Sequence, residues 1–167
     1  MFLLNRGIPR KPEVDMIISF AGHSVVFSKS NIKEIVKQQI RHNIVDSQHI
    51  VCYLGGYGDF DEICAQVCRE LKQEYADIEL VYVTPYIDLC NQSKIKEMQT
   101  HGLYDTFIYP PIENVPPRFA ILKRNEWMIT NSDILIAYVE HNYGGAYKSL
   151  QIAKRNKKKT INICDFL

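Results

Sequence analysis

Three carboxylates directly follow a glycine-rich turn in the stretch GGYGDFDE, which runs from Gly55 to Glu62. The turn comes after an apolar run and leads into a helical pattern, and free N–H groups at the start of such a helix can bind an anion. The side chains of Asp59, Asp61 and Glu62 could instead accept hydrogen bonds from sugar hydroxyls, or only complement the positive end of the helix dipole. Because successive helical residues point about 100° apart, not all three can face one pocket. We expect Asp59 to cap the helix and Asp61 to face the pocket, with Glu62 as the third candidate.

Glycine turns also follow the first and the fifth apolar runs of the chain, as Gly22-His23-Ser24 and as Asn142-Tyr143-Gly144-Gly145. Glycines let a ligand approach the backbone closely, although they can also serve only to make a tight turn. An aromatic ring in such a turn could stack on a base. The three turns predict the following ligand-binding residues: Gly22, His23, Ser24, Gly55, Gly56, Tyr57, Gly58, Asp59, Tyr143, Gly144 and Gly145.

Arg124 and Asn125 form a second cluster, on a helical stretch that leads to the fifth apolar run. The planar guanidinium of Arg124 would suit a phosphate, and the alternative is an ordinary surface arginine. The first glycine turn does not read Gly-x-Gly-x-x-Gly, and the chain contains no Walker Gly-Lys-Ser/Thr sequence. These absences argue against a standard dinucleotide site or P-loop.

No second histidine or acid has metal-ligand spacing to His23, so the sequence predicts neither a metal nor a cofactor. The five cysteines form no CxxC pair, which favours free thiols in a reducing cytoplasm. The net charge of +1 gives no general attraction to nucleic acid or to a membrane. No apolar run reaches the roughly 18 residues that span a bilayer. We therefore expect a cytoplasmic protein without a membrane partner.

Apolar runs alternate with helical patterns along the whole chain. The runs are continuous rather than alternating, which is typical of strands covered on both faces. This pattern predicts an α/β fold, a Rossmann-like, doubly wound and mostly parallel sheet with helices on both faces. The expected strands are 16–21, 49–54, 78–84, 107–109, 133–139 and 160–163, and the expected helices start near Ser30 or Asn31, at 60, 91 and 119, and after Gly144-Gly145.

We expect one domain over residues 16–167, because no linker, repeat or low-complexity segment interrupts it. Residues 1–15 are expected to be a flexible arm or a remnant of cloning. The basic run from Lys154 to Lys159 spans a helix end and the turn after it. Cations suit a helix C-terminus, and a nucleic-acid patch is the alternative interpretation.

Five segments, FAGHS, GGYGDFDEIC, VTPY, KRNEWMITNSDILIAYV and YGGAYKSLQIAKRNKKKTINI, resemble in order and spacing the SLOG superfamily. This superfamily joins the DNA-processing protein DprA with the cytokinin-activating LOG enzymes, and the most similar branch is the YpsA-like group of unknown function. The resemblance runs from about Met16 to Ile163. It implies a Rossmann-like fold that binds a nucleotide or nucleotide-derived ligand at the glycine edge. It also implies a homo-oligomer, because LOG-type proteins often form dimers.

The LOG enzymes hydrolyse the N-glycosidic bond of a nucleoside monophosphate, and they use an arginine before the fifth strand and a PGGxGTxxE turn after it. By resemblance, Arg124 matches this arginine, and Gly144 and Gly145 match the first two glycines. The chain departs from the motif at its third glycine, its threonine and its glutamate, where it has Tyr147, Lys148 and Gln151. Gln151 cannot stabilise an oxocarbenium-like charge as a carboxylate would, whereas Lys148 could still bind phosphate.

Three functions remain open at this point. The first is a nucleotide-binding sensor or scavenger module. The second is a nucleoside monophosphate glycosidase in which Arg124 acts with Asp61 or Glu62. The third is a nucleic-acid-binding partner protein, which the DprA resemblance and the basic run suggest.

Overall fold

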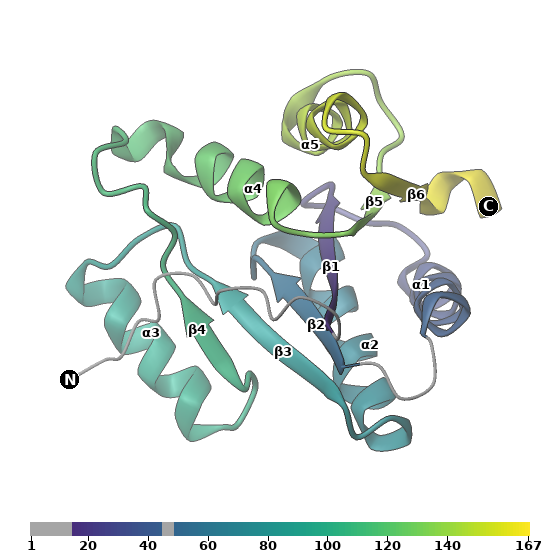
Figure 1. Ribbon diagram of the computed structural model, residues 1–167, viewed down its shortest axis with the longest axis horizontal. Coiled ribbons are helices and arrows are strands. Elements are labelled where there is room, and N and C mark those ends of the chain that lie inside the picture. The colour runs from purple at the N-terminus through teal and green to yellow at the C-terminus, as the bar shows by residue number, and fades with distance from the viewer. Residues whose placement is uncertain (1–14, 45–48) are drawn as a thin grey trace.

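The structure is a computed structural model that describes residues 15–44 and 49–167 (Figure 1). The predicted arm therefore lies outside the described residues, except for Asp15. Within the described residues a parallel sheet is formed by β1 (Asp15–Gly22), β2 (His49–Leu54), β3 (Ile78–Val83), β4 (Thr106–Ile108), β5 (Ile134–Tyr138) and β6 (Lys159–Asn162). The helices are α1 (Lys29–Asn43), α2 (Gly58–Glu74), α3 (Leu89–Thr100), α4 (Ala120–Thr130) and α5 (Gly144–Arg155), with short 3₁₀ helices at Pro117–Phe119 and Ile163–Phe166. The predicted Rossmann-like α/β class is confirmed.

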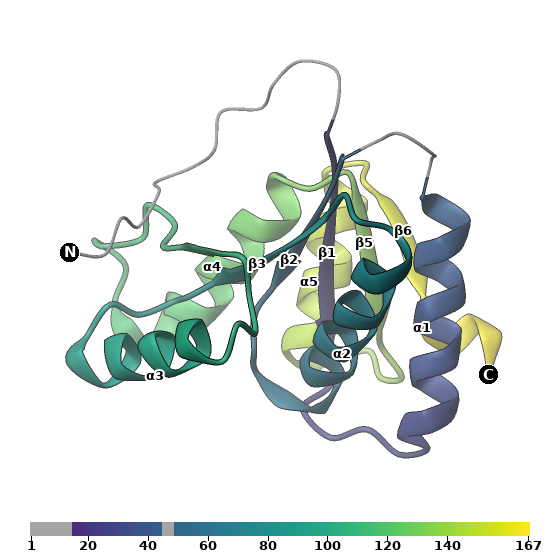
Figure 2. The same ribbon diagram turned by 90° about the horizontal axis from the view of Figure 1, so that it is seen from below.

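The helices form a layer on each side of the sheet, as Figures 1 and 2 show. On one face, α1 and α2 pack their apolar stripes against alternate sheet residues such as Ile18 and Leu54. On the other face, α4 and α5 cover the intervening sheet residues, among them Ile17 and Leu135. Covering both faces explains why the strand sequences are continuously apolar.

The strand order β4-β3-β2-β1-β5-β6 shows where the chain changes direction across the sheet. β1 pairs with β2 on one side and with β5 on the other, so successive strands are added on one side up to β4 and then on the opposite side from β5. In open α/β sheets, ligands bind beyond the carboxyl ends of the strands at this switch point. The turns after β1 and β5 meet there.

The start of α1 differs from the prediction. The helix begins at Lys29, earlier than the predicted caps Ser30 and Asn31. Ser28 precedes it in the left-handed conformation, with φ 55°, and its carbonyl accepts the N–H groups of Asn31 and Ile32. No side chain caps this helix, so Ser30 and Asn31 were a misleading signal.

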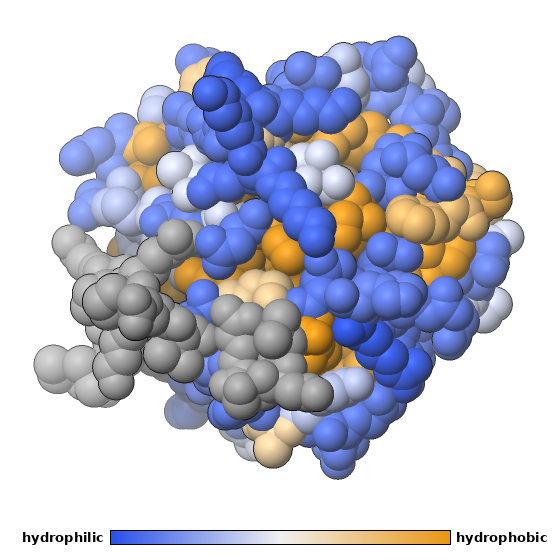
Figure 3. All heavy atoms as spheres, turned by 45° about the vertical axis from the view of Figure 1, so that its right-hand side comes forward, coloured by the Kyte–Doolittle hydropathy of each residue, from blue (hydrophilic) through white to orange (hydrophobic). Residues whose placement is uncertain are grey.

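Polar residues dominate the face shown in Figure 3, and smaller apolar patches lie between them. Among the described residues, no helix combines the length and the apolar character needed to cross a bilayer.

Candidate functional site

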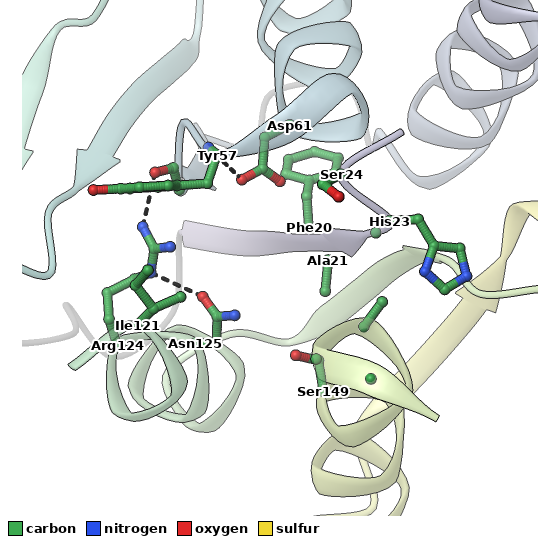
Figure 4. Close-up of a pocket in the computed structure, with 15 residues that line it drawn as sticks. Phe20, Ala21, His23, Ser24, Tyr57, Asp61, Ile121, Arg124, Asn125 and Ser149 are labelled. Carbon is green, nitrogen blue, oxygen red and sulfur yellow. Dashed lines mark hydrogen bonds between the residues drawn. The ribbon is translucent and has the colours of Figure 1, made fainter. Parts of the chain in front are cut away.

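A cavity of about 360 Å³ lies at the switch point (Figure 4). It is bounded by the ends of β1 and β2, by the first turns of α2 and α5, and by α4. Small-molecule sites have volumes of roughly 300–1,000 Å³, so the cavity could hold a ligand of modest size. Its lining consists of Phe20, Ala21, Gly22, His23, Ser24, Gly55, Tyr57, Asp61, Ile121, Arg124, Asn125, Gly144, Gly145, Ala146 and Ser149.

The structure brings many of the predicted site residues together in this lining. They are Gly22, His23, Ser24, Gly55, Tyr57, Asp61, Arg124, Asn125, Gly144 and Gly145. The other predicted residues lie outside it: Gly56, Gly58, Asp59, Glu62, Tyr143 and Lys148. The three glycine turns therefore do meet at one place. The whole first turn lines the cavity, but only part of each of the other two does.

Asp59 links the first turn of α2 to Val26 in the β1–α1 connection and to Lys29 at the start of α1, and it does not cap α2. Its Oδ2 accepts the N–H of Val26 at 3.0 Å, and its Oδ1 pairs with Lys29 at 2.8 Å. The helix begins at Gly58, and Tyr57 occupies the N-cap position without a side-chain cap. The expected cap is therefore wrong, because the helix begins before Asp59 and this carboxylate is turned toward the β1–α1 connection.

Glu62, Tyr143 and Lys148 are all exposed. Glu62 accepts a hydrogen bond from Gln66 at 3.1 Å and lines a second hollow outside the switch-point cavity. The ring of Tyr143 stacks on His141 with centroids 5.2 Å apart. None of the three side chains lines the switch-point cavity.

Arg124 is buried on α4, with an exposed fraction of 1%. Its Nη1 donates to the carbonyls of Gly55 at 2.8 Å and Val83 at 2.7 Å, and its Nε donates to Oδ1 of Asn125 at 2.8 Å. A Cβ at position 55 would lie 2.8 Å from Nη1, so a glycine is needed for this close approach. Arg124 thus fixes the carboxyl ends of β2 and β3 beside the cavity, and the guanidinium lies over the ring of Tyr57.

Asp61 is a buried carboxyl group that points into the cavity from the first turns of α2 (Figure 4). It accepts the backbone N–H of Tyr57 at 2.9 Å. Burial raises the pKa of Asp61 to about 6, although the Tyr57 N–H and the charge of Arg124 act in the opposite direction. A cleft carboxyl group that titrates near neutral pH is typical of functional sites.

The start of α5 lines the side of the cavity opposite Asp61. Gly144 has φ +85°, and no side chain caps the helix, so the N–H groups of its first turn lack a capping acceptor. Ser149 follows on the same helix and is fully buried, yet its hydroxyl has no hydrogen-bond partner within the described part of the chain. In Figure 4 the hydroxyl is on the cavity side of the helix.

Sequence reasoning missed Ser149, and helix periodicity could have found it. Ser149 lies four residues after Gly145, and residues at this spacing share one face of a helix. The same argument applies to Ile121, three residues before Arg124. Both residues line the cavity.

The lining combines two kinds of polar group. The uncapped N-terminus of α5 and the hydroxyls of Ser24 and Ser149 can donate hydrogen bonds to an anion. Asp61, across the cavity from Ser149 in Figure 4, can accept hydrogen bonds from hydroxyl groups when it is ionised. The arrangement suits a ligand with an anionic group at one end and hydroxyls at the other.

Comparisons with solved structures support the fold. DNA processing protein A from Helicobacter pylori matches with 18% identity and a TM-score of 0.53, over 87% of this chain and 63% of that one. DNA processing protein A from Streptococcus pneumoniae matches with 9% identity and a TM-score of 0.59, over 87% of this chain and 49% of that one. The molybdenum cofactor carrier protein from Chlamydomonas reinhardtii matches with 16% identity and a TM-score of 0.53, over 87% of this chain and 74% of that one.

The chain thus spans less than two thirds of either DNA processing protein, and at these identities the similarity shows the fold alone. No curated protein matches the chain in sequence. The family model YpsA, described as the YspA SLOG family, matches residues 26–166, which make up most of the chain. The chain therefore belongs to this SLOG family.

Proposed function

We propose that the protein binds a nucleotide or a nucleotide-derived ligand in the switch-point cavity. The phosphate is assigned to the N-terminus of α5 and to Ser149, and a sugar hydroxyl to Asp61. The observation that carries the proposal is that an uncapped helix start and a buried, unpartnered hydroxyl face a buried carboxyl group across one cavity of the described structure. This arrangement makes a sensor or scavenger of a nucleotide-derived signal the function that the site supports best.

The comparisons support a binding role without defining the ligand. The Helicobacter pylori protein is described as binding single-stranded DNA, and the Chlamydomonas reinhardtii protein as carrying the molybdenum cofactor. Proteins of this fold thus bind both a polynucleotide and a small cofactor. The size of the present cavity favours the small ligand.

A pair of neighbouring acids offers a matched test of the proposal. Asp61 lines the cavity and Glu62 does not. In isothermal titration with a panel of nucleoside mono- and diphosphates, Asp61→Asn should weaken binding about tenfold or more, because a charged acceptor is lost. Glu62→Gln should bind like the wild type. Equal affinities for the two variants, or no binding of any nucleotide by the wild type, would overturn the proposal.

Hydrolysis of the N-glycosidic bond is the second candidate, and the environment of Asp61 favours it. This carboxyl group has a pKa of about 6 and lies close enough to Arg124 for their charges to interact. When ionised, it could stabilise an oxocarbenium-like state while water adds to the sugar and the base leaves with a proton. The test is chromatography of nucleoside monophosphates after incubation, in which the release of free base by the wild type but not by Asp61→Asn would establish the activity.

A nucleic-acid partner would need a different surface. The basic run ends α5 and begins β6, so it lies at the edge where the strands start, opposite the cavity. Two of its lysines already donate locally, Lys158 to the carbonyl of Thr130 and Lys159 to Oδ1 of Asn43. A gel shift with single-stranded DNA at low and high salt would reveal a polynucleotide partner, because phosphate contacts weaken as salt rises.

A further inference from the structure

We propose that His23, Glu140 and His141 form a binding site for a divalent transition-metal ion of the zinc type, at the rim of the switch-point cavity. Each residue offers a ligand atom, and these atoms lie within 4.8 Å of one another. His23 comes from the turn after β1, and the other two residues follow β5. Two imidazoles and one carboxylate are the ligand set of zinc sites that keep a further coordination position open.

A hydrogen bond identifies the nitrogen of His23 that can bind a metal ion. Its Nε2 accepts the backbone N–H of Glu140 at 3.0 Å, so this nitrogen carries a lone pair and no proton. A neutral imidazole is the form that binds metal ions. Coordination through Nε2 would replace this hydrogen bond, and the N–H of Glu140 would turn to water because the residue is exposed.

The other two ligands are held by tyrosines. The hydroxyl of Tyr138 donates a hydrogen bond to the Glu140 carboxylate. The ring of His141 stacks on Tyr143, with an interplanar angle of 6°. The rings of His23 and His141 have centroids 5.3 Å apart. Outer contacts of this kind orient metal ligands before the ion arrives.

The spacing of residues along the chain could not predict this cluster. His23 and Glu140 are 117 residues apart, and only the pairing of β1 with β5 brings their turns together. A search of a sequence for metal sites recognises motifs of closely spaced ligands. His23, Glu140 and His141 do not form such a motif.

The test uses the metal alone, so its outcome does not depend on the proposed nucleotide. Tag-free protein, stripped by a chelator, is titrated with Zn²⁺ in competition with a chromophoric chelator. A Cys90→Ser background removes an exposed thiol that could bind zinc elsewhere. We expect one ion per chain with micromolar or tighter affinity, and a tetrahedral ligand-field spectrum with Co²⁺.

Variants assign the ion to the cluster. His141→Ala and Glu140→Gln should each weaken Zn²⁺ binding at least about tenfold, while His101→Ala, which changes an exposed histidine on a different loop, should bind normally. Zn²⁺ should raise the melting temperature of the background protein but not that of His141→Ala, and without metal the two should melt alike. Failure of the background protein to bind one ion, or unchanged binding by His141→Ala, would overturn the proposal.

Discussion

The buried polar side chains of the cavity differ in whether the chain itself supplies their partners. Arg124 donates to two backbone carbonyls and to Asn125. Asp61 receives one backbone N–H, and the hydroxyl of Ser149 has no partner within the described residues. A buried polar group without a partner destabilises the fold. We therefore interpret Arg124 mainly as a residue that positions the backbone around the site. We interpret Asp61 and Ser149 as the residues that bind the ligand.

Ser149→Ala separates a role in binding from a role in stability. If the hydroxyl serves only the ligand, its removal should leave the free energy of unfolding unchanged or raise it by about 1 kcal/mol, because an unsatisfied group is removed. Nucleotide affinity should fall roughly 10- to 100-fold, the effect of losing a hydrogen bond to a charged group. Denaturant unfolding and isothermal titration measure the two quantities. A large loss of stability would instead indicate a structural role for the hydroxyl.

The raised pKa of Asp61 predicts a pH-dependent stability. The pKa rises from 3.8 to about 6 on folding, so between these values the folded chain holds a proton that the unfolded chain has released. The free energy of unfolding should therefore fall by up to about 3 kcal/mol as pH rises through this window. Above the window, the contribution of Asp61 should no longer change with pH.

Asp61→Asn removes this titration and keeps an oxygen that can accept the N–H of Tyr57. The unfolding free energy of the variant relative to the wild type should thus increase between pH about 4 and about 7. Urea unfolding of both proteins across this range measures the difference. A difference that does not change with pH would contradict the assignment of a raised pKa to Asp61.

Residue types predicted part of the site. Which of these residues line the cavity depends on the side of the helix from which each one points. Successive helical residues point about 100° apart, so Asp61 and Glu62 cannot both face the pocket, and only Asp61 lines the cavity. Helix periodicity places Ser149 on the same face of α5 as Gly145, but it does not show that this serine has a special role. Its meaning depends on burial and on the lack of a partner among the described residues, which a sequence does not show.

At the scale of elements, the turn between β2 and α2 depends on backbone shape. Gly56 and Gly58 have φ +69° and +86°, and a Cβ on Gly58 would lie 2.6 Å from Cα of Ser24. Gly58 thus lets the turns after β1 and β2 pack together, whereas Gly56 makes room for the ring of Tyr82. Neither glycine lines the cavity.

Gly58→Ala and Gly102→Ala form a matched pair that tests this role. Gly102 also has a positive φ, of +61°, but a Cβ at this position would have no atom of the described residues within 4 Å. Gly102→Ala should therefore lower the free energy of unfolding by only about 1–2 kcal/mol, the cost of holding an alanine in the left-handed conformation. Gly58→Ala should cost at least about 1 kcal/mol more, because backbone atoms must also move. Equal losses in denaturant unfolding would show that the close packing at Gly58 is unimportant.

The elements themselves could be predicted well where the signal was a long apolar run. β1, β2, β3 and β5 lie within a residue of their expected bounds, because buried parallel strands need unbroken apolar sequence. The start of α1 could not be predicted, because its cap is a backbone conformation at Ser28 and involves no side chain.

At the scale of the molecule, the order of the strands creates the site. Sequence patterns indicate that turns end at the same edge of a parallel sheet, but they do not give the strand order. Only the position of β1 between β2 and β5 makes the turns after these strands neighbours. The same order places the basic run at the opposite edge, away from the cavity.

The most direct test of the central claim is a crystal structure of the protein with the nucleotide that binds most tightly in titration. The account predicts electron density for the phosphate at the N–H groups of Gly144 and Gly145 and at the hydroxyl of Ser149, with a sugar hydroxyl on Asp61. A nucleotide bound over the basic run from Lys154 to Lys159, or in the second hollow beside Glu62, would contradict it.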